Sequence, residues 1–228
     1  MSNIALVLAG GSGLRMGNDI PKQFLPLYGK PVIMYSLLAF QNHSQIDAIY
    51  VVGSKSFLSQ LSVLKEPAYG LTKLKEIVVG GETRKQSSYR GLVEIEKTAS
   101  KTDIVLIHDA ARPLVTEKII TENIKAAQNY GACATVVPVT DTIMLAKDTK
   151  TISQIPPRSM LYAAQTPQSF QLGIILSAHR SFVDFEEVTD DAGLLVHERT
   201  PVVLVEGDRK NIKLTTPEDL ELIKSYME

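Results

Sequence analysis

The sequence predicts an α/β fold in which a mostly parallel sheet carries helices on both faces. Two patterns support this prediction. Short, fully apolar runs recur along the 228 residues, and amphipathic stretches of helical length separate most of them. Strands that are apolar throughout are typical of parallel sheets that are covered on both sides. No repeat, low-complexity segment or linker divides the chain, so we expect one domain over residues 1–228.

The individual elements follow from hydrophobic periodicity. Six runs are predicted as strands: Ile4–Leu8, Ala48–Val52, Glu76–Val79, Asp103–His108, Cys133–Val139 and Val202–Glu206. Four stretches are predicted as helices: Val32–Asn42, Lys85–Lys97, Glu117–Tyr130 and Pro217–Met227. The last helix has a clear start, because Thr216 can cap it and proline suits the first helical position.

One segment, residues 139–162, breaks the alternation of strands and helices. It is polar, contains β-prone pairs and a turn candidate at residues 147–150, and shows no helical periodicity. It has too few apolar residues to build a core of its own. We therefore expect a protruding β-arm that lies on the domain or reaches a partner subunit.

Composition excludes several classes of protein. The net charge of −1 gives no bulk electrostatic reason to expect nucleic acid or an anionic membrane as a partner. A single cysteine, Cys133, excludes an internal disulfide and a cysteine-based zinc site, and it fits a reducing compartment. We see no targeting segment and no apolar run near the ~18 residues of a membrane span. A cytoplasmic protein is the expectation.

The glycine-rich stretch after the first strand is the main functional signal. The run Ile4–Leu8 leads into Gly10, Gly11 and Gly13, and then Arg15 and Lys22 follow. Glycines after a strand allow backbone N–H groups to approach and surround an anion. Two cations on the same loop make the combination suitable for a triphosphate.

This loop differs from the two commonest phosphate-binding patterns. A P-loop would have Lys and then Ser or Thr after its last glycine, and the chain does not. A dinucleotide fingerprint has a shorter glycine spacing and an acid that ends the second strand, which is absent from Ile49–Ser54. A dinucleotide-dependent oxidoreductase is therefore disfavoured. A nucleotide-sensing module without activity is the other alternative. It would not explain why Asp109, at the end of a later predicted strand, and Lys213, just before the last predicted helix, accompany Arg15 and Lys22.

Further candidate residues lie at the ends of other predicted strands. Gly80 and Gly81 precede Glu82 and Ser87, which suits contacts with a flat base, although an ordinary helix entry is the alternative. Asp109 ends a strand beside the phosphate loop, where a carboxylate can bind Mg²⁺; the alternative is a turn or cap. His108 precedes it and should point to the opposite face, as a structural residue.

Read together and in order, these motifs resemble one family from Leu6 to Leu220. They are LAGGSGLRMG, PKQFLPL-x-GKPV, GGETR, HDAARPL, VTDT, AAQTPQ-x-F, TDDA and EGD-x-x-NIK-x-TTPEDL. The family is 2-C-methyl-D-erythritol 4-phosphate cytidylyltransferase. The resemblance implies a Rossmann-like fold, a homodimer that exchanges the β-arm, and an enzyme that uses CTP, Mg²⁺ and methylerythritol phosphate to make CDP-methylerythritol and pyrophosphate.

The resemblance also implies a role for each matching residue. Eight would bind the nucleotide: Ala9, Gly10, Gly11, Gly13, Gly81, Glu82, Ser87 and Ala110. Five would bind the acceptor, a polyol phosphate: Asp109, Thr142, Arg158, Thr166 and Lys213. Asp109 would also be the Mg²⁺ ligand, and the arm residues Thr142 and Arg158 would act from the other subunit. Four are expected to be catalytic: Arg15, Lys22, Arg158 and Lys213.

Two departures from the family pattern concern the acceptor. Many members have P-A-A-G where this chain has Leu8 to Gly11, and a lysine is usual where it has Met144. Both features also occur in a sister family, the ribitol-5-phosphate cytidylyltransferases. However, the sister more often has HDSVRP, GQTPQ and TDAC in place of HDAARP, AAQTPQ and TDDA. Methylerythritol phosphate is therefore the expected acceptor, with ribitol 5-phosphate as the alternative.

Overall fold

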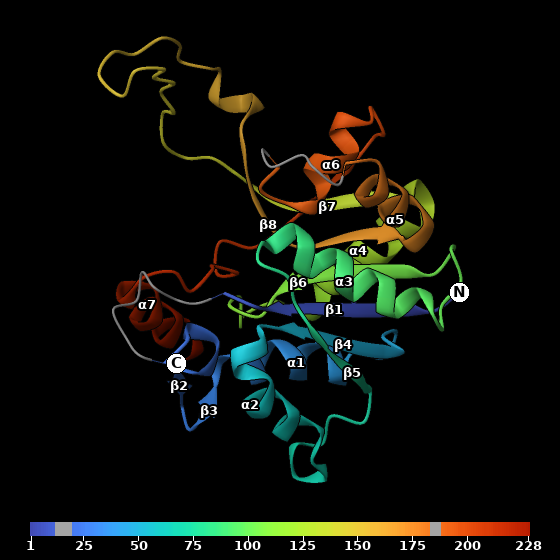
Figure 1. Cartoon of the computed structure of the whole chain (residues 1–228). Coiled ribbons are helices and arrows are strands. Elements are labelled where there is room, and N and C mark those ends of the chain that lie inside the picture. Colours follow the sequence, from blue (N-terminus) through green and yellow to red (C-terminus); the bar gives the residue numbers. More distant parts are fainter. Residues whose placement is uncertain (12–19, 183–187) are drawn as a thin grey trace.

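The computed structural model describes residues 1–11, 20–182 and 188–228 and centres on a seven-stranded sheet (Figure 1). The strand order is β5-β4-β1-β6-β8-β7-β9. The strands are β1 (Asn3–Ala9), β4 (Ala48–Gly53), β5 (Leu74–Val79), β6 (Ile104–Asp109), β7 (Ala132–Pro138), β8 (Tyr162–Gln171) and β9 (Val203–Glu206). Only β8 runs antiparallel to its neighbours, β6 and β7. The predicted mostly parallel sheet is confirmed.

The strands around β1 end together at one edge of the sheet. Ala9 at the end of β1 pairs with Gly53 of β4, and Leu8 pairs with Asp109 of β6. The chain passes from β1 to β4 on one side and later returns to place β6 on the other side of β1. In open α/β sheets, ligands bind in the crevice outside the carboxyl ends of the strands at such a reversal of strand order.

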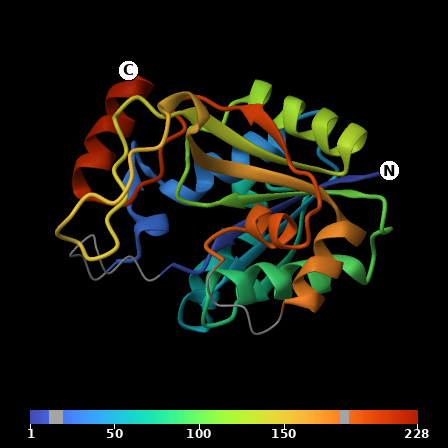
Figure 2. The same ribbon diagram turned by 90° about the horizontal axis from the view of Figure 1, so that it is seen from above.

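Helices cover both faces of the sheet, as the sequence predicts (Figure 2). One core cluster joins Ala5 and Val7 of β1 to α1, α2 and α4, and the other joins Ile4 and Leu6 to α3, α5 and α6. The alternation follows from the period of two in a strand. The helices are α1 (Val32–Asn42), α2 (Leu58–Ser62), α3 (Arg84–Glu96), α4 (Glu117–Tyr130), α5 (Leu172–Ser181), α6 (Asp191–His197) and α7 (Pro217–Met227).

A third, smaller cluster lies beside the carboxyl ends of the strands. It packs α7 against a short hairpin of β2 (Pro26–Leu27) and β3 (Lys30–Pro31). Its buried members are Leu25, Leu27, Val32, Ala111, Leu214 and Ile223. The start of α7 is fixed as predicted near Thr216, because the Asp219 carboxylate accepts hydrogen bonds from the backbone N–H of Thr215 (2.7 Å) and Thr216 (2.8 Å).

All ten predicted strands and helices are present, with ends within two residues of the predicted ones. The elements β2, β3, β8, α2, α5 and α6 were not predicted. Strand β8 lacks the apolar pattern from which strands are predicted, because most of its buried residues are polar. Gln165, Thr166, Gln168 and Ser169 are all buried there, and each makes specific hydrogen bonds that replace hydrophobic burial.

The segment between β7 and β8 projects away from the sheet and its helices (Figure 1). Asp148 organises a turn close to the predicted position, since its carboxylate accepts hydrogen bonds from the backbone N–H of Lys150 (3.0 Å) and Thr151 (2.8 Å). Between residues 139 and 161, all of which are described, β pairing is limited to one bridge, between Leu145 and Gln154. A projecting arm is present, but its predicted β structure is not confirmed.

No helix in the described part of the chain combines the length and apolar character that a bilayer crossing requires.

Candidate active site

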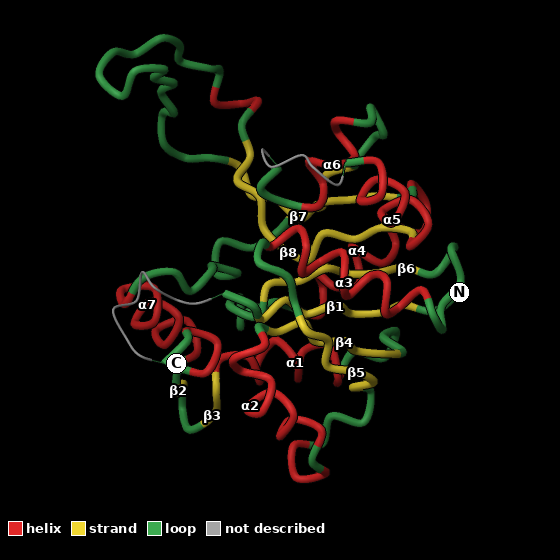
Figure 3. Tube along the Cα trace, in the orientation of Figure 1, coloured by secondary structure: helices red, strands yellow, loops and turns green. Residues whose placement is uncertain are grey.

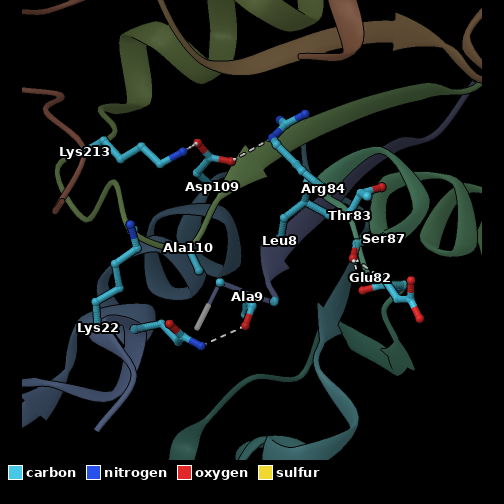
Figure 4. A pocket seen from close by; sticks show the side chains of 15 residues that line it. Leu8, Ala9, Lys22, Glu82, Thr83, Arg84, Ser87, Asp109, Ala110 and Lys213 are labelled. Carbon is cyan, nitrogen blue, oxygen red and sulfur yellow. Dashed lines mark hydrogen bonds and ion pairs between the residues drawn. The ribbon is translucent and has the colours of Figure 1, made fainter. Parts of the chain in front are cut away.

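A cleft of about 400 Å³ opens at the carboxyl ends of β1, β5 and β6 (Figure 4). The loops after these strands line it, together with residues that precede the β2–β3 hairpin and α7. Ten of the residues that the sequence singled out meet there: Ala9, Gly10, Gly11, Lys22, Gly81, Glu82, Ser87, Asp109, Ala110 and Lys213. Two others, Gly13 and Arg15, lie outside the described residues.

The first glycines form a floor between two polar side chains. A β-carbon at Gly10 would lie 3.6 Å from Ser87 Oγ, and one at Gly11 would lie 3.9 Å from Lys22 Cε. Longer side chains at either position would extend into the space between Ser87 and Lys22. Glycine therefore keeps the backbone at the end of β1 accessible to an anion.

The loop after β5 is held tightly against the first turn of α3. The backbone N–H of Gly81 donates to Ser87 Oγ (3.1 Å), and Thr83 caps the helix by accepting from the N–H of Gln86 (3.1 Å). A β-carbon at Gly81 would lie 2.3 Å from Gln86 Cβ, so only glycine fits. This packing presents Gly81 and Glu82 of the loop and Ser87 of α3 to the cleft side by side.

Lys22 is anchored by its neighbour in the chain, Gln23. Lys22 begins the short 3₁₀ helix η2 (Lys22–Phe24), and Gln23 Nε2 donates to the backbone carbonyl of Ala9 (2.9 Å). Gln23 is only 2% exposed, so this bond fixes η2 against the end of β1. Gln23 carries no signal of its own in the sequence, although it directly follows Lys22.

Asp109 lies between two cations from distant parts of the chain. Lys213 Nζ is 2.7 Å from Oδ2, and Arg84 Nε is 3.4 Å from Oδ1 (Figure 4). Burial, the largest single influence, raises the pKa of Asp109, but the charges of Arg84 and Lys213 together outweigh it and lower the pKa to about 2. The carboxylate is therefore ionised throughout the physiological pH range. Arg84 was not predicted from the sequence as a member of this site.

Thr166 lies beneath Asp109 rather than in the cleft lining. Its hydroxyl accepts from the backbone N–H of Asp109 (3.1 Å) and is 3.0 Å from His108 Nδ1. His108 points to the opposite face, where its ring packs edge-on to Phe40 at a centroid distance of 5.3 Å. The Nε2 atom of His108 lies 3.1 Å from the carbonyl oxygen of Arg112. Through these contacts, Thr166 and His108 hold the end of β6 in position.

His108 makes stability depend on pH. Burial lowers its pKa to about 4, against about 6.5 in an unfolded chain. Between these values the unfolded state binds more protons, so the free energy of unfolding falls as pH falls through this window, by about 2 kcal/mol between pH 7.5 and 5. We expect His108→Gln to remove this loss of about 2 kcal/mol, measured as the difference between the free energies of unfolding from denaturant titrations at pH 7.5 and pH 5. Equal slopes for wild type and His108→Gln would contradict the assignment.

The two arm residues are not brought to the cleft of their own chain. Thr142 and Arg158 are exposed on the projecting segment, and neither is part of the cleft lining. Arg158 Nη1 donates to the carbonyl of Thr140 (2.8 Å), within the arm itself.

The donor set at the cleft fits a substrate-bound metal better than a metal held by the protein alone. The described residues contain no cluster of three or more His, Cys, Asp or Glu side chains that could hold a metal. Mg²⁺ in nucleotide-dependent enzymes commonly takes one or two carboxylates, with phosphates and water as the other ligands. Asp109 supplies one carboxylate where phosphates would lie, so Asp109 is the residue that would hold the ion.

Comparison with known proteins identifies the family. The family model for 2-C-methyl-D-erythritol 4-phosphate cytidylyltransferase matches residues 3–228. The chain belongs to this family. The protein is accordingly a nucleotidyltransferase of the cytidylyltransferase class, and the glycine-rich start, the HDAARP stretch and the NIK stretch lie at the cleft in a fold shared with that family.

Members of both acceptor classes are similar to the chain. A "2-C-methyl-D-erythritol 4-phosphate cytidylyltransferase" of Clostridium novyi is 42% identical over 229 residues, which cover 99% of this chain and 96% of the relative. A "Ribitol-5-phosphate cytidylyltransferase" of Streptococcus agalactiae is 38% identical over 226 residues, which cover 98% of this chain and 94% of the relative. The solved 4-diphosphocytidyl-2C-methyl-D-erythritol synthase of Anaerococcus prevotii is 28% identical, with a TM-score of 0.83 over 99% of this chain and 96% of that one. Cytidylyl transfer is common to these relatives, and the acceptor differs.

Proposed function

We propose that this cytidylyltransferase transfers the cytidylyl group of CTP to 2-C-methyl-D-erythritol 4-phosphate, making CDP-methylerythritol and pyrophosphate. The observation that supports this acceptor is the pair Ala110 and Ala111, which line the cleft directly after Asp109. They belong to the HDAARP stretch, which resembles the methylerythritol enzymes, whereas the sister family more often has serine and valine there. The match to the family model agrees with this reading.

The reaction requires positioning and charge neutralisation rather than a general base. An oxygen of the acceptor phosphate attacks the α-phosphorus of CTP, and the bond from that phosphorus to the bridging oxygen breaks as pyrophosphate leaves with the electron pair. The attacking oxygen is already anionic, so no proton has to be removed from it. Two highly charged anions must nevertheless approach each other in line, and the protein has to offset their repulsion.

The residues of the cleft can divide this work between them. Backbone N–H groups at Gly10 and Gly11 would receive the triphosphate, while Lys22, with Arg15 from the same loop, would stabilise charge at the α-phosphate. Lys213 would bind a phosphate after exchanging its contact with Asp109, at 2.7 Å, for one with the substrate. Mg²⁺, when bound at Asp109, would neutralise phosphate charge and favour the departure of pyrophosphate.

The loop after β5 is suited to hold the cytosine and ribose. Its backbone lies close to the start of α3 because glycines occupy positions 80 and 81, and Ser87 Oγ is fixed by the N–H of Gly81 at 3.1 Å. A flat base can lie against such a surface, with Glu82 and Ser87 as polar partners. Gly81, Glu82 and Ser87 are therefore proposed as the base and ribose contacts.

Ribitol 5-phosphate is the second candidate acceptor, and two features of the chain favour it. The stretch Leu8 to Gly11 and Met144 both resemble the ribitol enzymes. A relative named as a ribitol-5-phosphate cytidylyltransferase also matches 98% of the chain at 38% identity. The chemistry at the α-phosphorus would be the same with either acceptor.

A substrate panel tests the proposed function. Purified protein with CTP and Mg²⁺ would receive methylerythritol phosphate, ribitol 5-phosphate or glycerol 3-phosphate as a short-chain control, and pyrophosphate release and product mass would be measured. We expect the highest kcat/KM with methylerythritol phosphate and a product with the mass of CDP-methylerythritol. Higher kcat/KM with ribitol 5-phosphate would establish the alternative. CTP binding without pyrophosphate release on any acceptor would contradict an acceptor of this class.

We further propose a homodimer in which each arm completes the partner's site. The arm projects from its own chain and exposes Ile143, Met144, Leu145, Ile152 and Ile155. Apolar side chains that are exposed together commonly mark a protein contact. Arg158 suits a phosphate because its guanidinium can bind two phosphate oxygens at once.

Mixing two inactive variants tests this arrangement. Lys22→Ala carries a lesion in the cleft and Arg158→Ala carries one in the arm, so a mixed dimer would contain one doubly damaged site and one intact site. We expect each heterodimer to recover about half of the wild-type activity, by counting sites in a twofold dimer. Lys22→Ala mixed with Asp109→Asn is the matched control; both lesions lie in the cleft, and no activity should return. A monomer in sedimentation, or no recovery after confirmed exchange, would refute the shared site.

A further inference from the structure

A line of charged side chains leads from the cleft into the interior of the protein. Lys213 contacts Asp109 at 2.7 Å, Asp109 contacts Arg84 Nε at 3.4 Å, and Arg84 Nη1 contacts Asp191 Oδ2 at 2.6 Å. The first three residues line the cleft, whereas Asp191 does not. Asp191 begins α6 and is only 1% exposed.

Asp191 is fixed in place by three other elements. Its Oδ1 atom accepts from Ser88 Oγ of α3 (2.6 Å) and lies 3.1 Å from His179 Nε2 of α5. From β8, Gln168 Oε1 accepts from the backbone N–H of Ala192 (3.0 Å), which holds the first turn of α6. Burial alone raises the pKa of Asp191, but Arg84, His179 and Ser88 together hold it below its usual range. Asp191 is thus a rigid, ionised carboxylate behind the cleft.

This carboxylate determines where the Arg84 guanidinium lies. Arginine has four rotatable side-chain bonds and loses much conformational freedom when it is fixed. Its contact with Asp109, at 3.4 Å, is long for a charged hydrogen bond, whereas the contact with Asp191, at 2.6 Å, is short. The firm attachment of Arg84 is therefore on the side away from the cleft, and Asp109 receives a guanidinium that is already in position.

We propose that Asp191 is a positioning residue for cytidylyl transfer, which acts by fixing Arg84 so that Arg84 orients the Asp109 carboxylate in the cleft. The inference rests on the proposed placement of the reaction in this cleft, and it assigns a function to the second aspartate of the TDDA stretch. Small displacements of groups that position substrates can cost about 10²-fold in rate. Loss of Asp191 should therefore lower kcat more than it raises KM for CTP.

The test compares Asp191→Asn with Asp190→Asn. Asparagine keeps the shape of either residue and removes one charge at the start of α6. Asp190 caps α6 by accepting from the N–H of Gly193 (2.9 Å), and it also accepts from Gln168 Nε2 (2.7 Å). We expect Asp191→Asn to reduce kcat by about 10- to 100-fold with KM for CTP within about threefold, and Asp190→Asn to keep kcat within about threefold. Calorimetric titration with CTP should give similar dissociation constants for both variants.

A double-mutant cycle separates this role from a general loss of structure. Arg84→Met removes the guanidinium, and Arg84→Met with Asp191→Asn leaves neither charge buried without its partner. If Asp191 acts through Arg84, Asp191→Asn will have little further effect on kcat in the Arg84→Met background. An equal fold-loss in both backgrounds would overturn the proposal, as would an unchanged kcat in Asp191→Asn. The cycle remains informative if Asp191→Asn alone is unstable. The double variant and Arg84→Met can still be compared, and their ratio of kcat gives the effect of Asp191→Asn in the absence of the guanidinium.

Failure of the proposed reaction can be distinguished from failure of the positioning role of Asp191. All variants would be assayed with the polyol phosphate on which the wild type is most active. A wild type inactive on every member of the panel would refute the proposed reaction. An active wild type whose Asp191→Asn variant matches Asp190→Asn would refute only the positioning role.

Discussion

Replacement of Lys22 by alanine is expected to lower kcat about 10²- to 10³-fold, or about 3–4 kcal/mol in activation free energy, while CTP binding weakens much less. The reason is the position of Lys22 beside the glycines that follow β1. Its Cε lies 3.9 Å from the place that a β-carbon at Gly11 would occupy. The helix η2, which Lys22 begins, is held against β1 by the hydrogen bond from Gln23 to the carbonyl of Ala9. A cation held there is most useful when charge develops at the α-phosphate. Single-turnover rates would measure the expected loss in the chemical step, and calorimetric titration would measure CTP affinity separately.

Lys30→Ala is the matched control. Lys30 is an exposed lysine of the neighbouring hairpin, eight positions further along the chain, and it is not part of the cleft lining. Its loss should leave kcat within about twofold. Arg15→Ala should resemble Lys22→Ala, because both cations belong to the same loop. Turnover of Lys22→Ala within a few-fold of the wild type would remove Lys22 from the catalytic residues.

Asp109→Asn is expected to abolish activity at ordinary Mg²⁺ concentrations, or to make it depend on much more Mg²⁺. The substitution keeps the shape of the side chain and removes the charge that lies between Arg84 and Lys213. Two cations would then face each other without their common counter-ion, and the carboxylate ligand of the proposed metal would be lost. The measurement is the rate as a function of Mg²⁺ concentration at saturating CTP.

Asp103→Asn provides the control for this experiment. Asp103 lies just before the other end of β6, where its carboxylate accepts hydrogen bonds from the backbone N–H of Ser2 (2.8 Å) and Ser100 (2.8 Å). Its loss should lower the melting temperature and leave the Mg²⁺ dependence of the folded enzyme unchanged. If Asp109→Asn kept full activity at ordinary Mg²⁺, the metal ligand would have to be sought elsewhere.

The part of the site that could be predicted from sequence is the part built from strand ends. Glycines after β1 and β5 and the acid that ends β6 are visible because each directly follows an apolar run. Parallel pairing then brings those ends together, as in the register of Leu8 with Asp109. Lys213 was found through the resemblance to a family, since a single lysine before a helix has no local signal.

The residues that were missed depend on contacts across long stretches of chain. Arg84 looks like an ordinary residue of a helix start, and its two carboxylate partners lie 25 and 107 positions away. Asp191 was noted within TDDA, but its burial against Ser88 and His179 cannot be read from sequence. The role of Gln23 is equally invisible in the sequence, because it depends on one hydrogen bond to the carbonyl of Ala9. Tertiary contacts, rather than periodicity, define these roles.

The small cluster beside the cleft has a consequence for synthesis of the protein on the ribosome. Leu25, close to Lys22, and Leu214, next to Lys213, share this cluster with Ile223 of α7. The supports of both lysines are thus completed by the last helix. A nascent chain that has already formed most of its sheet would still lack a working cleft until α7 has emerged from the exit tunnel. Formation of the cleft thereby depends on synthesis of α7, and chains that stop before it would lack this support of both lysines.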